Sequence, residues 1–236
     1  MNGIEEVFSV FLTRLIGGYA LCFGLIGPSV TEGSWRRVSL FTLAGLSLVA
    51  LFASRGDDCV MVACGVTAAA ALVLERLHAF RIPVWSSPRW ILPFGLWVLL
   101  ANEWPPGLDT FPSAIVLGGT LGAMLLGHSY LTVKQLGFGP LRRMAWILFV
   151  VLILRVLSVT PAFFGPRLEM MDYIYLMLRC GLGLFVPLVL GWMVIQCVRI
   201  ESNQSATGIL YAMTVLVGVF GELIAVYLRM TRGIAA

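Results

Sequence analysis

Residues 173–198, YIYLMLRCGLGLFVPLVLGWMVIQCV, decide the fold class of this chain. This stretch contains a single charged residue, Arg179, and its apolar side chains are continuous rather than alternating. About 20 apolar residues suffice to span a bilayer as an α-helix, and a helix satisfies its own backbone polar groups in lipid. The stretch is therefore predicted to be a transmembrane helix, with a kink at Pro187 after Gly181 and Gly183.

Seven further apolar runs have the same character, and none alternates as a transmembrane strand would. The sequence thus predicts an all-α, polytopic helical membrane protein with about eight transmembrane helices arranged as four hairpins. The runs at 38–54 and 90–103 are the shortest, so seven spans with 90–103 as a re-entrant segment is the main alternative. The eight predicted helices cover 7–27, 38–54, 59–77, 90–103, 111–131, 144–164, 173–198 and 206–228.

The composition agrees with a membrane environment for the whole chain. Hydrophobic residues make up 59% of the sequence and charged residues 12%, and the mean hydropathy is +0.94. A soluble domain carries about a quarter charged residues, so we expect residues 1–236 to form a single integral membrane domain. The net charge of +4 comes from arginines in short loops and helix ends. Such charges are typical of topogenic signals and do not indicate a nucleic-acid partner.

Loop charges predict the orientation in the lipid bilayer. With eight helices, the loops after the first, third, fifth and seventh hold most of the basic residues, and short cytoplasmic loops carry that excess. We expect a bacterial inner (plasma) membrane protein with both termini outside the cytoplasm. A cleavable signal peptide begins with basic residues, whereas this chain has Glu5 and Glu6 near its start. The first helix is therefore expected to stay as an anchor. The basic residues of the four loops are Arg36, Arg37, Arg76, Arg81, Arg89, Lys134, Arg142, Arg143 and Arg199.

Four ionisable residues lie well inside the predicted helices: Arg14, Arg155, Arg179 and Glu222. Helices 1 and 7 run in one direction and helices 6 and 8 in the other, so all four are expected on one side of the midplane. At 1.5 Å per residue they lie roughly 10 Å below one surface. A charge at mid-bilayer costs about 2.5–3.5 kcal/mol, so these side chains should face protein or a water-filled cavity.

Two interpretations of this intramembrane polar cluster are open. In the first, Glu222 pairs with one arginine and the other arginines extend toward the surface. In the second, three arginines against one glutamate leave positive charge that binds an anionic headgroup, a carboxylate, a phosphate or a quinone carbonyl. Asn102 and Glu103, at the end of the fourth helix, would join the cluster and lower its net charge.

The two histidines, His78 and His128, are predicted near the cytoplasmic ends of the third and fifth helices. Two imidazoles from neighbouring helices are typical axial ligands of a b-type haem, and they also suit a metal site or a proton relay. The alternative is a pair of interfacial histidines without a cofactor. The five cysteines include no C-x-x-C pair, which argues against a thiolate metal site and a disulfide framework.

No signature of a familiar membrane enzyme occurs: there is no H-E-x-x-H, aspartate-rich prenyl-diphosphate, G-x-S-x-G or Walker motif. This favours an integral membrane subunit or binding module, associated with other subunits of a larger membrane complex. The alternatives are a small transporter for an anionic solute and an enzyme acting on a lipid-borne substrate. In span number and orientation the prediction resembles the quinol-oxidising membrane anchors of molybdoenzyme-type reductases. No motif accompanies that resemblance, so it implies no residue roles.

Overall fold

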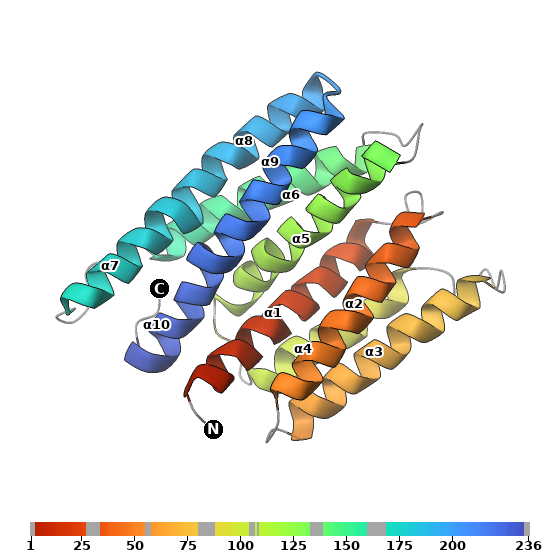
Figure 1. Cartoon of the computed structure of the whole chain (residues 1–236), viewed down its shortest axis with the longest axis horizontal. Helices are drawn as coiled ribbons and strands as arrows, with labels where there is room; N and C mark the ends of the chain where they lie inside the picture. The colour runs from red at the N-terminus through yellow and green to blue at the C-terminus, as the bar shows by residue number, and fades with distance from the viewer. Residues whose placement is uncertain are drawn as a thin grey trace.

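The computed structural model describes residues 3–26, 34–54, 58–79, 88–103, 107, 109–132, 139–159 and 169–233. Within these ranges the chain is helical and contains no strand, which confirms the predicted all-α fold. The helices lie side by side in one elongated bundle, with the start of α1 and the end of α10 at the same end (Figure 1). The elements are α1 (Gly3–Ile26), α2 (Ser34–Ala53), α3 (Asp58–Ala79), η2 (Pro88–Ile91), α4 (Leu92–Asn102), α5 (Thr110–Thr132), α6 (Gly139–Val159), α7 (Met170–Leu178), η4 (Arg179–Phe185), α8 (Val186–Arg199), α9 (Asn203–Val215), η5 (Leu216–Leu223) and α10 (Ile224–Arg232).

Each predicted apolar run corresponds to one helix or to one uninterrupted series of helical segments, and successive runs pack in pairs as four hairpins. Among the described residues, six helices are long and apolar enough to cross a membrane. The other two are short or charged. α4 has 11 residues, and every 18-residue stretch of α6 contains Arg142, Arg143 and Arg155.

The fourth run does not return to the end of the bundle at which it enters. A Cβ on Gly24 would lie 2.4 Å from Leu92 at the start of α4. At the other end of α4, Asn102 donates a hydrogen bond to Thr13 at 3.0 Å. α4 therefore runs antiparallel to residues 13–24 of α1, and the number of complete membrane crossings stays a prediction.

The predicted bounds of the sixth helix, 144–164, are wrong at their start. α6 begins at Gly139, five residues earlier, and includes the exposed residues Arg142 and Arg143. Pro140 suits the first turn of a helix, where its missing N–H costs no hydrogen bond. Long arginine side chains extend from such a turn toward water, so these charges do not end the helix. Residues 160–164 lie outside the described residues.

Eight of the described helices form two groups of four with the same order of neighbours. In the first group, α1 packs on α2 and α4, α2 packs on α3, and α3 packs on α4. In the second, α5 packs on α6 and α9, α6 packs on α8, and α8 packs on α9. The first helix of each group, α1 or α5, packs on the other at the centre of the bundle (Figure 1).

Glycines make the central contact between α1 and α5. A Cβ on Gly18 would lie 1.7 Å from the carbonyl oxygen of Ala114, and a Cβ on Gly118 would lie 2.0 Å from the backbone nitrogen of Tyr19. Small residues let helix backbones approach closely in membranes. Gly118 and Gly122 form a G-x-x-x-G motif on α5, and this motif joins the two groups through Gly118.

Candidate functional site

Arg179 and Glu222 lie in the two π-helical segments of the second group. Arg179 is the first residue of η4, and Glu222 is close to the end of η5. π-helical segments are rare and occur frequently at functional sites. These two segments interrupt the last two membrane-crossing runs at a similar depth and pack against each other.

Local sequence explains the interruption in η4. The N–H of Val186 bonds to the carbonyl of Gly181, five residues earlier, and Pro187 has no N–H to offer the carbonyl of Gly183. Gly183 packs directly on η5, because a Cβ on it would lie 2.5 Å from Cα of Gly221. The predicted kink at Pro187 is thus a π-helical segment that brings two backbones together.

Arg155 of α6 forms a fully buried, bidentate ion pair with Glu222. Its Nε donates to Oε1 at 3.0 Å and its Nη2 donates to Oε2 at 2.7 Å. The side chains of both residues are 0% exposed. The hydroxyl of Ser113 on α5 also donates to Oε2 of Glu222. Paired hydrogen bonds between a guanidinium and a carboxylate are among the strongest in proteins, so this pair fixes α6 against η5.

Arg14 connects the two groups of helices. Its Nε and Nη2 donate to Oε1 of Glu103 at 3.1 and 2.7 Å, and its Nη2 also lies 3.3 Å from Oδ2 of Asp109. Its Nη1 donates to Ser113 at 2.9 Å. Because Ser113 in turn donates to Glu222, one hydrogen-bonded network runs from the first group to the buried pair of the second.

Arg229 of α10 continues this network to the surface. Its Nη1 donates to both carboxylate oxygens of Asp109 at 2.9 and 3.0 Å, and its side chain is 36% exposed. Glu103 accepts a further hydrogen bond from Thr110 at 2.5 Å. Asn102 does not join the ion pairs, and it donates instead to the hydroxyls of Thr13 and Ser9.

Arg179 is buried beside this network and has no hydrogen-bond partner among the residues that the structure describes. Its side chain is 0% exposed, and no hydrogen-bond acceptor among the described residues lies within reach of its Nε, Nη1 or Nη2. Arg155, Glu222 and Asp109 are charged residues that act on it electrostatically. Both carboxylates already accept hydrogen bonds from other arginines. Arg179 does not extend its side chain toward the surface, as the first sequence interpretation would require.

The charge balance differs from the simple sequence count of three arginines against one glutamate. The connected network contains Arg14, Arg155 and Arg229 against Glu103, Asp109 and Glu222, so it is neutral by itself. Among the described residues at this site, the surplus is one positive charge, and it belongs to Arg179.

Asp109, Ser113 and Arg229 are three members of the network that sequence reasoning missed, and Thr110 is a fourth. Asp109 and Arg229 lie at helix ends on the same side of the membrane, so their charges had the appearance of topogenic signals. Ser113 is an ordinary polar residue in the first turns of α5. One feature of the sequence could have indicated them: Asp109, Ser113 and Arg229 are predicted at a depth in the membrane similar to that of Glu103, at the end of the fourth helix.

The two histidines are on helices of different groups. His128 is exposed on α5, and its Nδ1 lies 3.2 Å from the hydroxyl of Tyr211 on α9. His78 is in the last turn of α3, and its side chain lies outside the described residues. A b-type haem held by these two residues stays a prediction. Within the described residues, no three His, Cys, Asp or Glu side chains are grouped as metal ligands.

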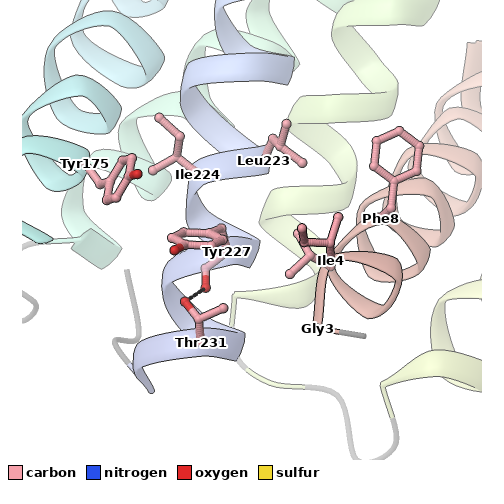
Figure 2. A pocket seen from close by; sticks show the side chains of 9 residues that line it. Gly3, Ile4, Phe8, Tyr175, Leu223, Ile224, Tyr227 and Thr231 are labelled. Atoms are coloured by element: carbon pink, nitrogen blue, oxygen red, sulfur yellow. Dashed lines mark hydrogen bonds between the residues drawn. The ribbon is translucent and has the colours of Figure 1, made fainter. Parts of the chain in front are cut away.

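An apolar groove of about 530 Å³ opens between the first turns of α1 and the η5–α10 junction. Figure 2 shows Ile4 and Phe8 on one side of it, Leu223, Ile224 and Tyr227 on the other, and Tyr175 of α7 beyond them. The residues that line the groove do not include Arg179 or a member of the polar network, although two of them are near these residues in the sequence. Leu223 directly follows Glu222, and Tyr175 precedes Arg179 by one turn on the same helix face.

No protein family model matches the chain, and no match is found among curated proteins or among solved structures.

Proposed function

We propose that this chain is a multi-pass integral membrane binding module, or a non-catalytic subunit of a larger membrane complex. In this proposal, Arg179 binds the oxygen atoms of one anionic group or of a quinone. Six long apolar helices among the described residues support the membrane assignment. The excess of basic residues at one end of the bundle favours the bacterial inner membrane, with both termini outside. The site then lies in the outer half of the bilayer.

One observation carries the proposal: the guanidinium of Arg179 is fully buried and its three nitrogens have no acceptor within the part of the chain that the structure describes. Leaving a buried charge without a partner costs several kcal/mol. A bound oxyanion removes that cost, because the planar guanidinium donates two parallel hydrogen bonds to it. A quinone carbonyl would accept one of these hydrogen bonds without neutralising the charge.

The surrounding residues support a site that is already formed. Glu222 is held by Arg155 and Ser113, and Asp109 is held by Arg229. Neither carboxylate is available to Arg179 without breaking an existing ion pair. The close contact of Gly183 with Gly221 fixes the backbone that carries Arg179. A bound group would therefore meet a fixed donor rather than a side chain that must first be ordered.

The proposal is tested by identifying the small molecules that co-purify with the protein. The wild-type chain, Arg179→Gln and Arg142→Gln would be extracted in mild detergent, and their organic extracts compared by liquid chromatography and mass spectrometry. Arg142 is the matched control, since it is an exposed arginine on α6. We expect one compound in near-stoichiometric amount from the wild type and Arg142→Gln, and its loss from Arg179→Gln. Identical extracts from all three proteins would contradict the proposal.

A transporter for an anionic solute is the second candidate, and the arrangement of the helices favours it. Some transporters consist of two parallel repeats related by an axis along the membrane normal, with interrupted helices at the substrate site. The two four-helix groups have the same order of neighbours, and the last two crossings contain the π-helical segments η4 and η5. Liposomes containing the pure protein would then show anion flux, and Arg155→Gln would abolish it. Liposomes without flux would leave the binding module as the function.

A further inference from the structure

We infer that the protein has a second binding site, separate from Arg179, for an anionic phospholipid. The lipid phosphate lies on Arg143, and part of one acyl chain lies in a groove between α1 and α6, named the α1–α6 groove. The lining of this groove contains neither Arg179 nor a member of the polar network, so the inference goes beyond the proposed function. The lining includes Cys22 and Leu25 of α1, Ile115 of α5, and Arg143, Met144 and Ile147 of α6.

The α1–α6 groove follows from the way in which α1 and α6 pack on α5. Both helices contact α5, and they do so near Gly119. A Cβ on Gly119 would lie 2.8 Å from Leu148 of α6 and 3.2 Å from Sγ of Cys22 of α1. α1 and α6 therefore reach the same part of α5 from two sides. The groove lies between them, with Ile115, one turn before Gly119, in its lining.

Arg143 is the charged residue of this lining, so a positive charge and an apolar surface belong to one site. Its side chain is exposed, and within the described ranges no ion pair or hydrogen bond ties its guanidinium to another residue. A phosphate on Arg143 therefore gains charge-assisted hydrogen bonds without breaking an existing pair. A hydrocarbon chain attached to that phosphate reaches the apolar residues of the same groove.

The order of polar and apolar residues along the groove matches a phospholipid. Arg143 lies in the second turn of α6, and a long arginine side chain extends from such a position toward the headgroups. Ile147 follows one turn later on α6, about 6 Å nearer the bilayer midplane. Leu25 and Ile147 are 68% and 42% exposed. The apolar part of the groove is therefore open to the hydrocarbon of the bilayer, and its charged part lies toward water.

The size of the groove favours a membrane lipid over a soluble ligand. Its volume is about 90 Å³, whereas sites that enclose a small molecule measure about 300–1,000 Å³. A groove of this size holds part of one acyl chain, and the rest of a phospholipid stays in the bilayer. A soluble amphiphile would have to leave most of its apolar surface outside the groove.

The charges at this end of the bundle favour a lipid with a net negative charge. Arg142, next to Arg143, is also exposed and has no ion pair within the part of the chain that the structure describes. The carboxylates described at this end are Glu75, which pairs with Arg37, and Glu201. A zwitterionic headgroup would bring its own cation beside these arginines, whereas an anionic headgroup would not. The exposed arginines described at this end are Arg37, Arg76, Arg89, Arg142, Arg143 and Arg199.

Native mass spectrometry of the delipidated full chain in detergent measures the dissociation constant of the first lipid that binds. Three probes are compared: phosphatidylglycerol, phosphatidylcholine with the same acyl chains, and glycerophosphoglycerol, which is the headgroup of phosphatidylglycerol without its chains. One arginine near a membrane surface strengthens the binding of anionic lipid about fivefold. We expect phosphatidylglycerol to bind at least about fivefold more tightly than each of the other two probes.

Two pairs of variants test the two parts of the site. Arg143→Gln should weaken the binding of phosphatidylglycerol about fivefold. Its control, Arg199→Gln, changes an exposed arginine at the same end but outside the groove, and should bind like the wild type. Ile147→Trp fills the groove and should weaken phosphatidylglycerol, whereas Ile153→Trp, also exposed on α6 but outside the groove, should not. Unchanged unfolding midpoints without lipid show that the four variants are folded.

Each part of the inference has a result that overturns it. Equal affinity of Arg143→Gln and the wild type for phosphatidylglycerol, or an equal loss in Arg199→Gln, would show that Arg143 does not hold the phosphate. Equal affinity for phosphatidylcholine would overturn the net negative charge of the lipid. Binding of glycerophosphoglycerol as tight as that of phosphatidylglycerol, or no effect of Ile147→Trp, would overturn the place of the acyl chain in the groove.

Discussion

At the scale of single residues, the site is defined by which charges are paired. Arg155 and Glu222 form a closed pair, and Arg179 beside them has no acceptor among the described residues. The two partners of the pair are therefore not equivalent. Removing Arg155 leaves Glu222 next to one remaining arginine, whereas removing Glu222 leaves two arginines facing each other.

This asymmetry predicts different stabilities for two variants that break the same ion pair. Glu222→Gln should lose about 3–5 kcal/mol, the usual cost of removing one partner of a buried ion pair. Arg155→Gln should lose about 1–3 kcal/mol, the cost of unmade buried hydrogen bonds, because Glu222 can then pair with Arg179. Unfolding of both variants in mild detergent would measure the difference. Equal losses, or a larger loss in Arg155→Gln, would show that Arg179 is too far away to replace Arg155.

At this scale the sequence identified four charged residues but not their pairing. Their depth could be predicted because a helix advances by a constant rise per residue. The partners could not, because Arg14 bonds to Glu103, 89 residues away, and Arg155 bonds to Glu222, 67 residues away. Such pairs depend on which helices are neighbours and on how each helix is rotated, and a single sequence contains neither.

At the scale of elements, the two π-helical segments position the site. η4 provides Arg179 and η5 provides Glu222, and they meet where Gly183 packs on Gly221. Continuous apolar composition predicted one helix through each region, and the structure agrees to within a few residues at each end. The sequence signalled the interruption of η4 through Pro187, whereas η5 contains no proline. The second π-helical segment could therefore not be predicted from the sequence.

Two alanine substitutions within η4 test the importance of this contact. A Cβ on Gly183 would lie 2.5 Å from backbone atoms of η5, whereas a Cβ on Gly181 would meet nothing within 4 Å. Gly183→Ala should separate the segments, lose about 1–3 kcal/mol of stability and release the co-purifying ligand. Gly181→Ala, its control, should retain the ligand and gain up to about 1 kcal/mol from better helix propensity. The same ligand content in both variants would show that the glycine contact does not position Arg179.

At the scale of the whole molecule, two groups of four helices join along α1 and α5. The four hairpins could be predicted from the sequence because eight apolar runs with short loops allow little else. The matching order of neighbours in the two groups could not, since no sequence repeat accompanies it. The two groups share only the order in which their helices pack on one another. Many different apolar side chains allow the same packing order.

The contact between α1 and α5, which joins the two groups of helices, should depend on glycine at position 118. A Cβ on Gly118 would lie 2.0 Å from the backbone nitrogen of Tyr19, and a Cβ on Gly45 of α2 would meet nothing within 4 Å. Gly118→Ala should therefore lower stability by about 1–3 kcal/mol or more, while Gly45→Ala should not lower it. The thermal unfolding midpoints of the two variants test this prediction. An unchanged midpoint in Gly118→Ala would contradict the close contact between α1 and α5 at this position.

The proposed orientation is tested with a thiol that the chain already contains. Cys59 is exposed in the first turn of α3, and α3 begins at the end of the bundle where α1 starts and α10 ends (Figure 1). Cys22 and Cys64 are buried, and Cys180 and Cys197 are half-buried within apolar helices. A membrane-impermeant maleimide should label Cys59 from outside intact inner membranes, and Cys59→Ser should lose the label. Labelling that requires disrupted membranes would reverse the orientation.

The central claim is that Arg179 carries one positive charge that a bound anion neutralises. Native mass spectrometry of the gently extracted chain tests it most directly, by the mass retained in the wild type, Arg179→Gln and Arg155→Gln. We predict one anionic molecule per wild-type chain and none on either variant, since Arg179→Gln removes the charge and Arg155→Gln lets Glu222 neutralise it. The same bound mass on Arg179→Gln as on the wild type would contradict the claim.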